Sequence, residues 1–463
     1  MLPDEVLIVI FDFCADEVPY AKKQIEAWQS LIHVCRRWRT VVFGSPRRLN
    51  LQLACSSKTP ARDTLDVWPA LPLVVVINAR GFPVKSVDNI VAVLERSNRV
   101  RTISVIGVFS SDLEKVLAAM QVPFPELTYL ELKPNDEMVT VIPDSFLGGS
   151  ARRLQYLYFH DIPFPGLPKL LLSATHLVNL RLHDIPHSGY ISPETMVSAL
   201  SALTSLSVLY VRFQSPRSLP DRTSRRPPPL TRFILPALMI FSFKGVSDYL
   251  EDLVSRIDAP RLDTLRITFF NQIVFDTPQF IQFISRTSTS EALVKASVSF
   301  EDGKAVIDIS SQSYYRSLKV GISCRELDWQ VSSLEQVCTL CLPPLSMLED
   351  LYISEEPSWQ SDWQDNIENT LWLELLLPFT SVKNLYLSEE LARRIVPALQ
   401  ELVGGRTTEV LPALENIFLE GTQPSEPVQE GIEQCIATRQ ATDHPITVSC
   451  WERREARSQE VYG

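Results

Sequence analysis

Apolar residues recur through most of the chain in a short unit of form Leu-x-x-Leu-x-Leu, with aliphatic or aromatic substitutions. The alternation at the end of each unit is typical of a short strand that buries one side. Successive units start 23 to 34 residues apart, except for one interval of 86 residues. The units are Leu127-Leu130-Leu132, Leu154-Leu157-Phe159, Leu177-Leu180-Leu182, Leu206-Leu209-Val211, Leu238-Phe241-Phe243, Leu262-Leu265-Ile267, Leu348-Leu351-Ile353, Val382-Leu385-Leu387 and Leu414-Ile417-Leu419.

Helical patterns lie between these units, for example over 87–94 and 113–120. A strand and a helix that repeat at this interval indicate a leucine-rich solenoid, in which neighbouring units stack to bury faces that no unit buries alone. Regular repeats carry Asn or Cys three residues after the last Leu of the strand, and here only Asn135 occupies that place. We therefore expect an irregular solenoid with differently held turns. A generic α/β domain with buried parallel strands is the alternative.

The long interval has a different pattern. Residues 294–300 alternate, Glu301-Asp302-Gly303-Lys304 follows, 306–309 is mainly apolar, and 318–322 forms a second strand-like run. Asp-Gly between two apolar runs predicts a β-hairpin. We expect these strands to continue the sheet without the leucine-rich pattern.

The first fifty residues show helical periodicity instead. Pro3 suits a first helical position, and Asp4 and Glu5 complement the helix dipole. Apolar residues at helical spacing recur at Val6, Leu7, Ile10 and Phe11, and again over 31–42. An ordinary helical hairpin that buries one face in its own core would show the same periodicity.

The order of residues in these two helices resembles an F-box, the module that docks the adaptor of cullin-type ubiquitin ligases. The resemblance rests on Leu-Pro-x-Glu-x-Leu at 2–7, Ile-Phe at 10–11 and Val-Cys-Arg-x-Trp-Arg at 34–39. The stretches 47–51 and 62–73 are similar to the expanded F-box families of mushroom-forming fungi. The resemblance implies a Skp-type adaptor as partner, and through it a cullin. It places adaptor contacts at Leu2, Pro3, Val6, Leu7, Ile10, Phe11, Val34, Cys35 and Trp38.

These patterns predict an α/β chain with an N-terminal helical F-box and an irregular leucine-rich-repeat-like solenoid built on a parallel sheet. The expected division is an F-box over 1–50, a coupling segment or cap over 51–80 and the repeats over 81–451, with a charged tail over 452–463. Within the repeats, 215–229 combines prolines with four arginines and is expected to be a loop, either a solvated insertion or a docking segment.

Composition narrows the function classes. The 463 residues are 45% hydrophobic and 21% charged, as in a folded protein, and the net charge of −11 argues against non-specific nucleic-acid binding. The longest aliphatic run, 71–77, is short for a bilayer span, and the acidic start does not look like a signal peptide. We expect an intracellular protein, cytoplasmic or nuclear, with no membrane and no nucleic-acid partner.

Candidate chemistry is sparse. The twin pairs His160-Asp161 and His183-Asp184 would suit a general base or a cation, but the stacking of equivalent repeat positions also explains them. Cys338-x-x-Cys341 lacks the second pair of a zinc ribbon, and buried free thiols are the simpler interpretation. Trp359 and Trp363 are either target anchors or the core face of a helix.

The sequence thus predicts no catalytic residue, no metal and no cofactor. The expected function is substrate recognition in a cullin-type (SCF) ubiquitin ligase, with the repeats holding an unknown target protein for ubiquitin-dependent degradation. An F-box and repeat interaction protein that works outside any ligase is the alternative. An enzyme with an unrecognised site in the repeats is a third hypothesis.

Overall fold

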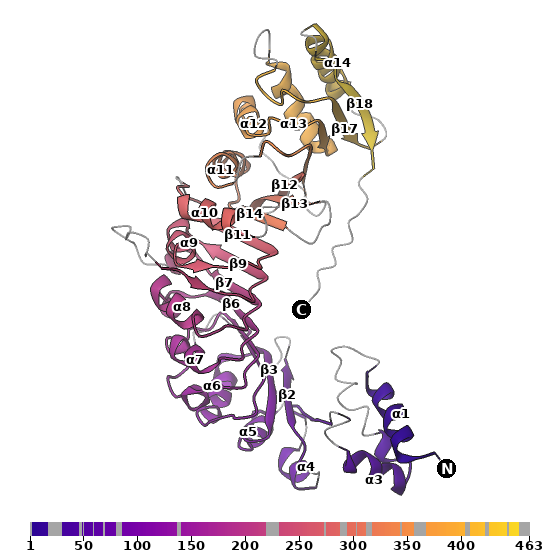
Figure 1. Cartoon of the computed structure of the whole chain (residues 1–463), viewed down its shortest axis with the longest axis vertical. Coiled ribbons are helices and arrows are strands. Elements are labelled where there is room, and N and C mark those ends of the chain that lie inside the picture. Colours follow the sequence, from indigo (N-terminus) through magenta and orange to yellow (C-terminus); the bar gives the residue numbers. More distant parts are fainter. Residues whose placement is uncertain are drawn as a thin grey trace. The chain divides into compact units, whose positions relative to one another are not determined.

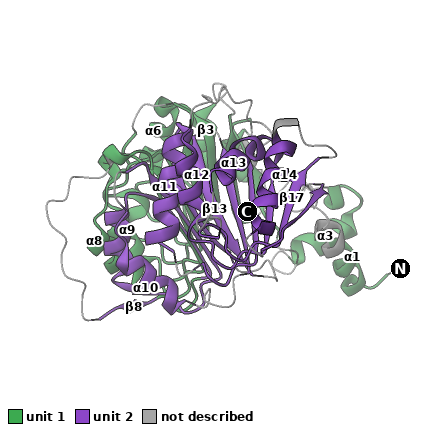
Figure 2. Cartoon of the chain, turned by 90° about the horizontal axis from the view of Figure 1, so that it is seen from above, with its two compact units in different colours: residues 1–221, 235–238 green, residues 222–234, 239–463 purple. Residues whose placement is uncertain are grey.

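A computed structural model describes most of the chain. The described residues are 2–16, 30–45, 49, 51–58, 60–67, 70–79, 86–136, 140–218, 231–272, 275–287, 294–301, 303–311, 317–342, 345–355, 367–402, 408–421, 426–441 and 444–452. The chain forms two compact units, one of residues 1–221 with 235–238 and one of residues 222–234 with 239–463 (Figure 2). None of the described helices is long and apolar enough to cross a membrane.

Unit 1 begins with helices and continues as alternating strands and helices. Its sheet is parallel and runs in chain order from β1 to β7. Helices α5 to α8 lie along one face of this sheet (Figure 1). The elements are α1 (Asp4–Asp16), α3 (Arg36–Gly44), β1 (Leu53–Cys55), α4 (Ala61–Val67), β2 (Leu73–Asn78), α5 (Val87–Leu94), β3 (Val100–Val108), α6 (Ser110–Ala119), β4 (Tyr129–Pro134), η1 (Phe146–Gly149), β5 (Tyr156–His160), α7 (Leu167–Ser173), β6 (Asn179–Ile185), η2 (His187–Gly189), α8 (Pro193–Leu200), β7 (Val208–Phe213) and η3 (Pro216–Ser218).

The strands of unit 2 follow one another in the sheet in the order β9-β11-β14-β13-β12-β15-β16-β17-β18. Its pairs are parallel except for β12 with β13 and β13 with β14. The elements are β8 (Phe233–Ile234), β9 (Ile240–Gly245), α9 (Ser247–Val254), β10 (Ile257–Asp258), β11 (Thr264–Phe270), α10 (Pro278–Arg286), β12 (Lys295–Glu301), β13 (Lys304–Ser310), β14 (Ser317–Ser323), α11 (Leu327–Leu340), β15 (Asp350–Glu355), α12 (Asn369–Leu376), β16 (Asn384–Leu387), α13 (Glu389–Gln400), β17 (Asn416–Glu420), α14 (Glu426–Ala441) and β18 (Thr447–Trp451).

The leucine-rich units of the sequence are the strands of these sheets. All nine triplets are buried, and the last two residues of each triplet lie in β4, β5, β6, β7, β9, β11, β15, β16 and β17, respectively. The alternate residues of each strand point to the face opposite the helices. The fold is therefore an α/β, leucine-rich-repeat-like array with a mainly parallel sheet, as the sequence predicts.

The long interval between leucine-rich units holds an antiparallel meander. Strands β12, β13 and β14 pair in sequence, and Gly303 takes the left-handed conformation, φ 74°, in the first turn. The outer strands of the meander then pair in parallel, β14 with β11 and β12 with β15. The predicted hairpin and the continuation of the sheet are both present.

Side chains from neighbouring repeats hold the turns, in place of the regular Asn. Asp136, just after β4, accepts the backbone N–H of Ser110 at 3.0 Å and so caps α6. Gln272, after β11, accepts the N–H of Ser247 at the start of α9, at 3.1 Å. Glu251, buried on α9, accepts the N–H groups of residues 279 and 280 at 2.9 and 2.8 Å and caps α10. These caps satisfy donors that a helix end leaves open.

The N-terminal helices pack against the coupling segment. One buried cluster combines residues of α1, of α3 and of the chain just before and after α3 with two residues of the coupling segment, namely Leu7, Ile8, Phe11, Ile32, Val41, Val42, Leu49, Leu51 and Leu71. We call it the joint cluster. The segment over 51–80 contributes β1 and β2, the first two strands of the sheet of unit 1.

Three sequence predictions fall largely or wholly outside the described residues. They are the Pro/Arg-rich loop beyond 218, the tryptophans Trp359 and Trp363, and the charged tail beyond 452.

Candidate functional site

The N-terminal helices carry an exposed apolar surface. Leu2, Val6, Ile10 and Val34 keep 52%, 41%, 40% and 59% of their area exposed, and Pro3 and Cys35 are exposed beside them. Val9, also on α1, is exposed as well. Exposed apolar side chains gathered on one element mark an interaction surface more often than scattered ones do. Six of the nine predicted adaptor contacts lie on this N-terminal surface.

The other three predicted contacts have inner positions. Leu7 and Phe11 belong to the joint cluster and are 4% and 1% exposed. Trp38 is half-buried, with its ring centroid 4.8 Å from that of Phe11. These residues position the surface and contribute little of its area.

Polar contacts hold the two helices in register. The Arg37 guanidinium donates to the Asp4 carboxylate at 2.6 Å and to the Leu2 carbonyl at 2.5 Å. The Cys35 thiol accepts the N–H of Trp38 at 3.4 Å and caps α3. The motif residues therefore have structural roles next to their exposed neighbours.

A second surface lies on the sheet of unit 1, on the face opposite the helices. Side chains at equivalent strand positions form rows across β3 to β7. The first two rows are Thr102, Tyr129, Tyr156, Asn179, Val208 and Ser104, Glu131, Tyr158, Arg181, Tyr210. Tyr129 stacks on Tyr156 with ring centroids 4.4 Å apart, and the Arg181 guanidinium lies over Tyr210 at 4.9 Å. Interlocked aromatic and arginine side chains of this kind are typical of binding surfaces.

The third row is basic. It includes Lys133 of β4, His160 of β5, His183 of β6 and Arg212 of β7, all close to the carboxyl ends of the strands. The rings of His160 and His183 are nearly parallel with centroids 6.3 Å apart, and Tyr210 stacks on His183 at 5.5 Å. Burial, followed by the charges of Arg212, His160, Arg181 and Lys133, lowers the pKa of His183 to about 3.

The twin His-Asp pairs have a local explanation. Asp161 and Asp184 take left-handed backbone conformations, φ 54° and 50°, which Asp tolerates better than most residues. His160 Nε2 lies 3.2 Å from Asp184 Oδ2, so one pair is linked across the strands. Among the described residues no three His, Cys, Asp or Glu side chains gather as a metal site.

Unit 2 carries its own rows on the equivalent strand positions. Tyr352, Tyr386 and Phe418 stack with centroids 4.2 and 4.5 Å apart, and Trp451 of the last strand meets Tyr386 edge-on at 5.5 Å. Beside them the side chains of Asp350, Asn384, Asn416 and Thr447 form a hydrogen-bonded ladder across β15 to β18. These side chains satisfy one another, so the ladder is a structural feature.

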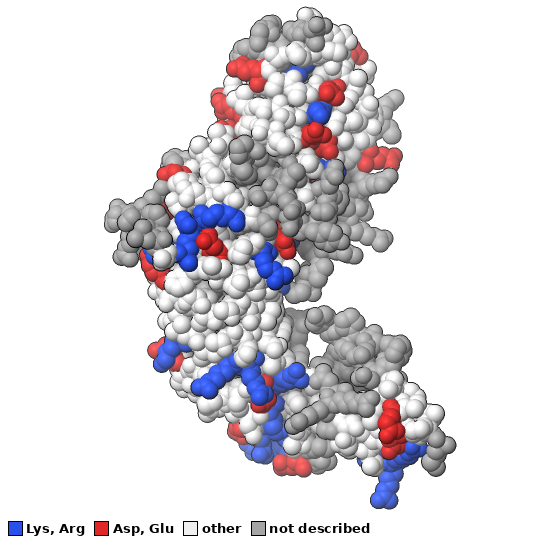
Figure 3. Space-filling model, viewed as in Figure 1, with Lys and Arg blue, Asp and Glu red and all other residues white. Residues whose placement is uncertain are grey.

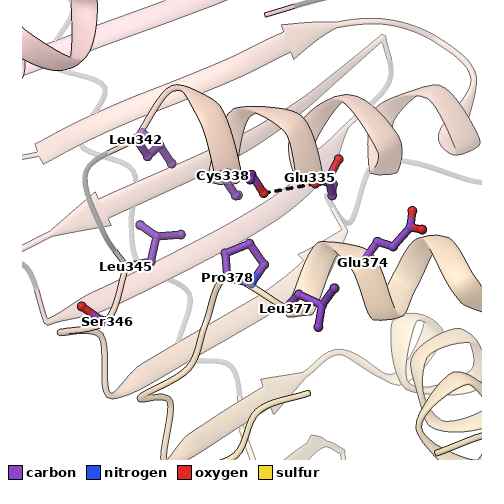
Figure 4. Close-up of a pocket in the computed structure, with 9 residues that line it drawn as sticks. Glu335, Cys338, Leu342, Leu345, Ser346, Glu374, Leu377 and Pro378 are labelled. Carbon is purple, nitrogen blue, oxygen red and sulfur yellow. Dashed lines mark hydrogen bonds between the residues drawn. The ribbon is translucent and has the colours of Figure 1, made fainter. Parts of the chain in front are cut away.

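A pocket of about 710 Å³ lies between α11 and α12 (Figure 4). Its lining is Glu335, Cys338, Thr339, Leu342, Leu345, Ser346, Glu374, Leu377 and Pro378. The Thr339 hydroxyl donates a hydrogen bond to the Glu335 carboxylate at 3.1 Å. Burial raises the pKa of Glu335, and the charge of Glu374 raises it further, whereas the bond from Thr339 lowers it.

Burial lowers the reactivity of both thiols of the Cys-x-x-Cys pair. Cys338 is fully buried at this pocket, and burial raises its pKa strongly. Burial likewise raises the pKa of Cys341 to about 11. A reactive thiol needs a lowered pKa, so this pair has the opposite character.

Arginines also line a smaller cleft of about 370 Å³ at the amino ends of the unit 1 strands. Its charged residues are Arg99, Arg101, Glu126 and Arg153. Arg153 pairs with Glu126, and Arg99 donates to the Leu71 carbonyl at 3.0 Å. On the face shown in Figure 3, basic side chains gather in the region of β2, β3 and α5. These arginines already have partners, whereas Lys133 and Arg212 of the basic row have none among the residues that the structure describes.

Sequence patterns found the helical surface and the twin histidines but not the basic row. Lys133 and Arg212 sit 79 positions apart and follow no motif. The available signal was the outward position of each residue within its Leu-x-x-Leu-x-Leu unit, once those units are stacked in register.

Comparisons with known proteins add little. No protein-family model matches the chain, and no curated protein matches its sequence. Among solved structures, a leucine-rich repeat-containing protein, LegL7 from Legionella pneumophila, matches with 10% sequence identity and a TM-score of 0.26. The match covers 83% of this chain and 97% of that chain. A likeness this distant carries no functional argument, so the repeat architecture rests on the strands and buried triplets described above.

Proposed function

We propose that this protein is a substrate-recognition subunit of a cullin-type (SCF) ubiquitin ligase. The N-terminal surface would dock a Skp-type adaptor, and the repeat array would hold a target protein. Ubiquitin transfer then follows from proximity, because a tethered target meets the ubiquitin carrier at a raised effective concentration. The kinship would be with the expanded F-box families of mushroom-forming fungi.

The observation that carries this proposal is that some apolar motif residues are buried in the joint cluster while others remain exposed. Leu7 and Phe11 face the joint cluster, whereas Leu2, Val6, Ile10 and Val34 remain exposed although they are apolar. A helical hairpin that only buried its own core would have no need of that second apolar side. Its exposure supports a partner that covers it.

Binding of recombinant Skp-type adaptor by the full chain tests the proposal. The double variant Val6→Asp with Ile10→Asp should weaken binding about a hundredfold or more, because each carboxylate would be desolvated without a partner at the contact. Both side chains are exposed, so the variant should still fold. Leu172→Asp is the matched control, since Leu172 of α7 is 54% exposed outside the N-terminal surface. Equal binding by the double variant and the control would refute the docking assignment.

An interaction protein that acts outside any ligase is the second candidate. It shares the exposed N-terminal surface but predicts no cullin in the assembly. Affinity purification of the full chain from its native cell distinguishes the two, because only a ligase subunit recovers both adaptor and cullin.

A further inference from the structure

The basic row of unit 1 brings positive groups together near the carboxyl ends of β4 to β7. Lys133 and Arg212 act electrostatically on both His160 and His183, so all four side chains share one small region.

The acidic residues near this row contact side chains other than Lys133 and Arg212. Asp184 lies 3.2 Å from His160, and Glu131 accepts hydrogen bonds from Ser104 and Tyr129 at 2.8 and 3.0 Å. Within the described part of the chain, Lys133 and Arg212 form no ion pair and no hydrogen bond. The side chains of both cations are thus unpaired within the described part of the chain.

His183 adds an unsatisfied polar atom in the same place. Its Nε2 is buried and has no hydrogen-bond partner among the described residues. The ring is held from two sides, stacked on Tyr210 at 5.5 Å and edge-on to Tyr158 at 5.2 Å. A buried polar atom without a partner costs free energy that a bound group would recover.

We propose that the basic row, formed by Lys133, His160, His183 and Arg212, binds an anionic side chain of an acidic segment of the target protein. Carboxylate and phosphate share the required chemistry, namely oxygen acceptors with negative charge. The neighbouring tyrosines of the second row, Tyr158 and Tyr210, would support the peptide backbone beside that group. The proposal rests on the proposed function in taking the repeat array as the target-binding part.

The charge of the protein favours a peptide over a nucleic acid as the ligand of the basic row. The row offers two free cations on a chain of net charge −11, whereas a nucleic acid needs many positive contacts along its backbone. The half-buried tyrosines beside the row suit the mixed polar and apolar contacts of a protein segment.

Fluorescence anisotropy with three short labelled peptides of matched length tests the proposal on the full chain. One peptide is rich in glutamate, one carries phosphoserine at the same positions, and one carries lysine. The glutamate or the phosphoserine peptide should bind at least about tenfold more tightly than the lysine peptide, and the preference should shrink as salt rises. Tighter binding of the phosphoserine peptide would identify phosphate as the source. No preference over lysine would overturn the proposal.

Charge-neutral variants locate the site. Arg212→Gln should weaken binding about tenfold, and Lys133→Gln with Arg212→Gln should reduce it to the level of the lysine peptide, because charge-assisted hydrogen bonds are lost. Arg153→Gln is the control, since Arg153 belongs to the arginine cleft and already pairs with Glu126. Equal weakening by Arg153→Gln would show general attraction and refute the site.

The histidine ring signals give a second readout that does not depend on affinity alone. Adding the bound peptide should shift the NMR ring resonances of His160 and His183 while His176, exposed before β6, stays unchanged. Adaptor binding by the unmodified full chain is measured in parallel. Failure of that chain to bind the adaptor while it binds the acidic peptide would refute the ligase proposal and leave the site standing.

Discussion

At the scale of single residues, burial sets the chemistry of this protein more than sequence motifs do. The half-buried His183 ring packs against Tyr158 and Tyr210, and burial together with the charges of neighbouring basic side chains lowers its pKa to about 3. The twin His-Asp pattern suggested catalysis or metal binding as an option, and the lowered pKa of His183 favours an uncharged ring at neutral pH. Only the surroundings reveal that, and they come from four strands.

The buried neutral ring makes stability depend on pH. In the unfolded chain His183 takes up a proton below about pH 6.5, whereas the folded chain resists until about pH 3. The folded state therefore loses stability as the pH falls through that window. Between pH 7 and pH 5 the full shift would cost about 2 kcal/mol, and solvent screening reduces this to about 1 kcal/mol.

Urea unfolding at both pH values checks this expectation. His183→Gln should lose about 1 kcal/mol less than the wild type on acidification, because Gln has no proton to gain. His187→Gln is the control, since His187 is exposed in η2. An identical loss in wild type and His183→Gln would contradict the buried, neutral state.

The cysteines give a residue-scale prediction of a different kind. Alkylation of the native protein at neutral pH should label Cys35 and Cys450, which are exposed, and leave Cys338 and Cys341 unmodified. Burial raises the pKa of both protected thiols, so the reactive thiolate is scarce as well as inaccessible. Peptide mass spectrometry with and without urea measures the pattern. Early labelling of Cys338 would show that the pocket beside it opens.

At the scale of elements, the sequence predicted what depends on neighbouring positions along the chain. The buried triplets and the Asp302-Gly303 hairpin follow from periods and turn preferences within a few residues. The helix caps did not, because Glu251 and Gln272 act on backbone groups 25 to 29 positions away. The basic row escaped prediction for the same reason. Register between strands, not sequence distance, brings its members together.

Two adjacent glycines in η1 test a close approach between segments that are distant from each other in the sequence. Gly148 and Gly149 both have positive φ, 63° and 73°, but a Cβ on Gly148 would meet Pro123 Cγ at 2.7 Å and one on Gly149 would meet nothing within 4 Å. Gly149→Ala should cost about 1 kcal/mol of stability from backbone strain alone. Gly148→Ala should cost about 1 to 3 kcal/mol more, because the proline must move. Equal losses in thermal or urea unfolding would show that Pro123 yields freely.

At the scale of the whole molecule, the coupling segment belongs to both of the parts it joins. Leu49, Leu51 and Leu71 enter the joint cluster with α1 and α3, while β1 and β2 open the sheet of unit 1. The compact units divide near residue 221, and residues 1–80 all belong to unit 1. The N-terminal helices are thus packed as part of unit 1.

That packing predicts coupling between the repeat array and the N-terminal surface. Leu71→Ala should raise amide hydrogen exchange in α1 and α3, because a large-to-small change in this cluster costs about 2 to 5 kcal/mol. Leu94→Ala is the control, since Leu94 is equally buried in α5 but lies outside the cluster. Unchanged exchange in α1 and α3 with Leu71→Ala would show that the helices fold independently of the array.

The antiparallel meander of unit 2 also bears on the order of folding. Strands β12, β13 and β14 follow one another with short connections, whereas each parallel pair beside them must first enclose a long stretch of chain. Local pairing closes faster than distant pairing, so the meander is expected to form first. Its two outer edges then become templates on which the flanking strands β11 and β15 align. Until those strands arrive, both edges are unpaired, and newly made chains are most exposed to aggregation through them.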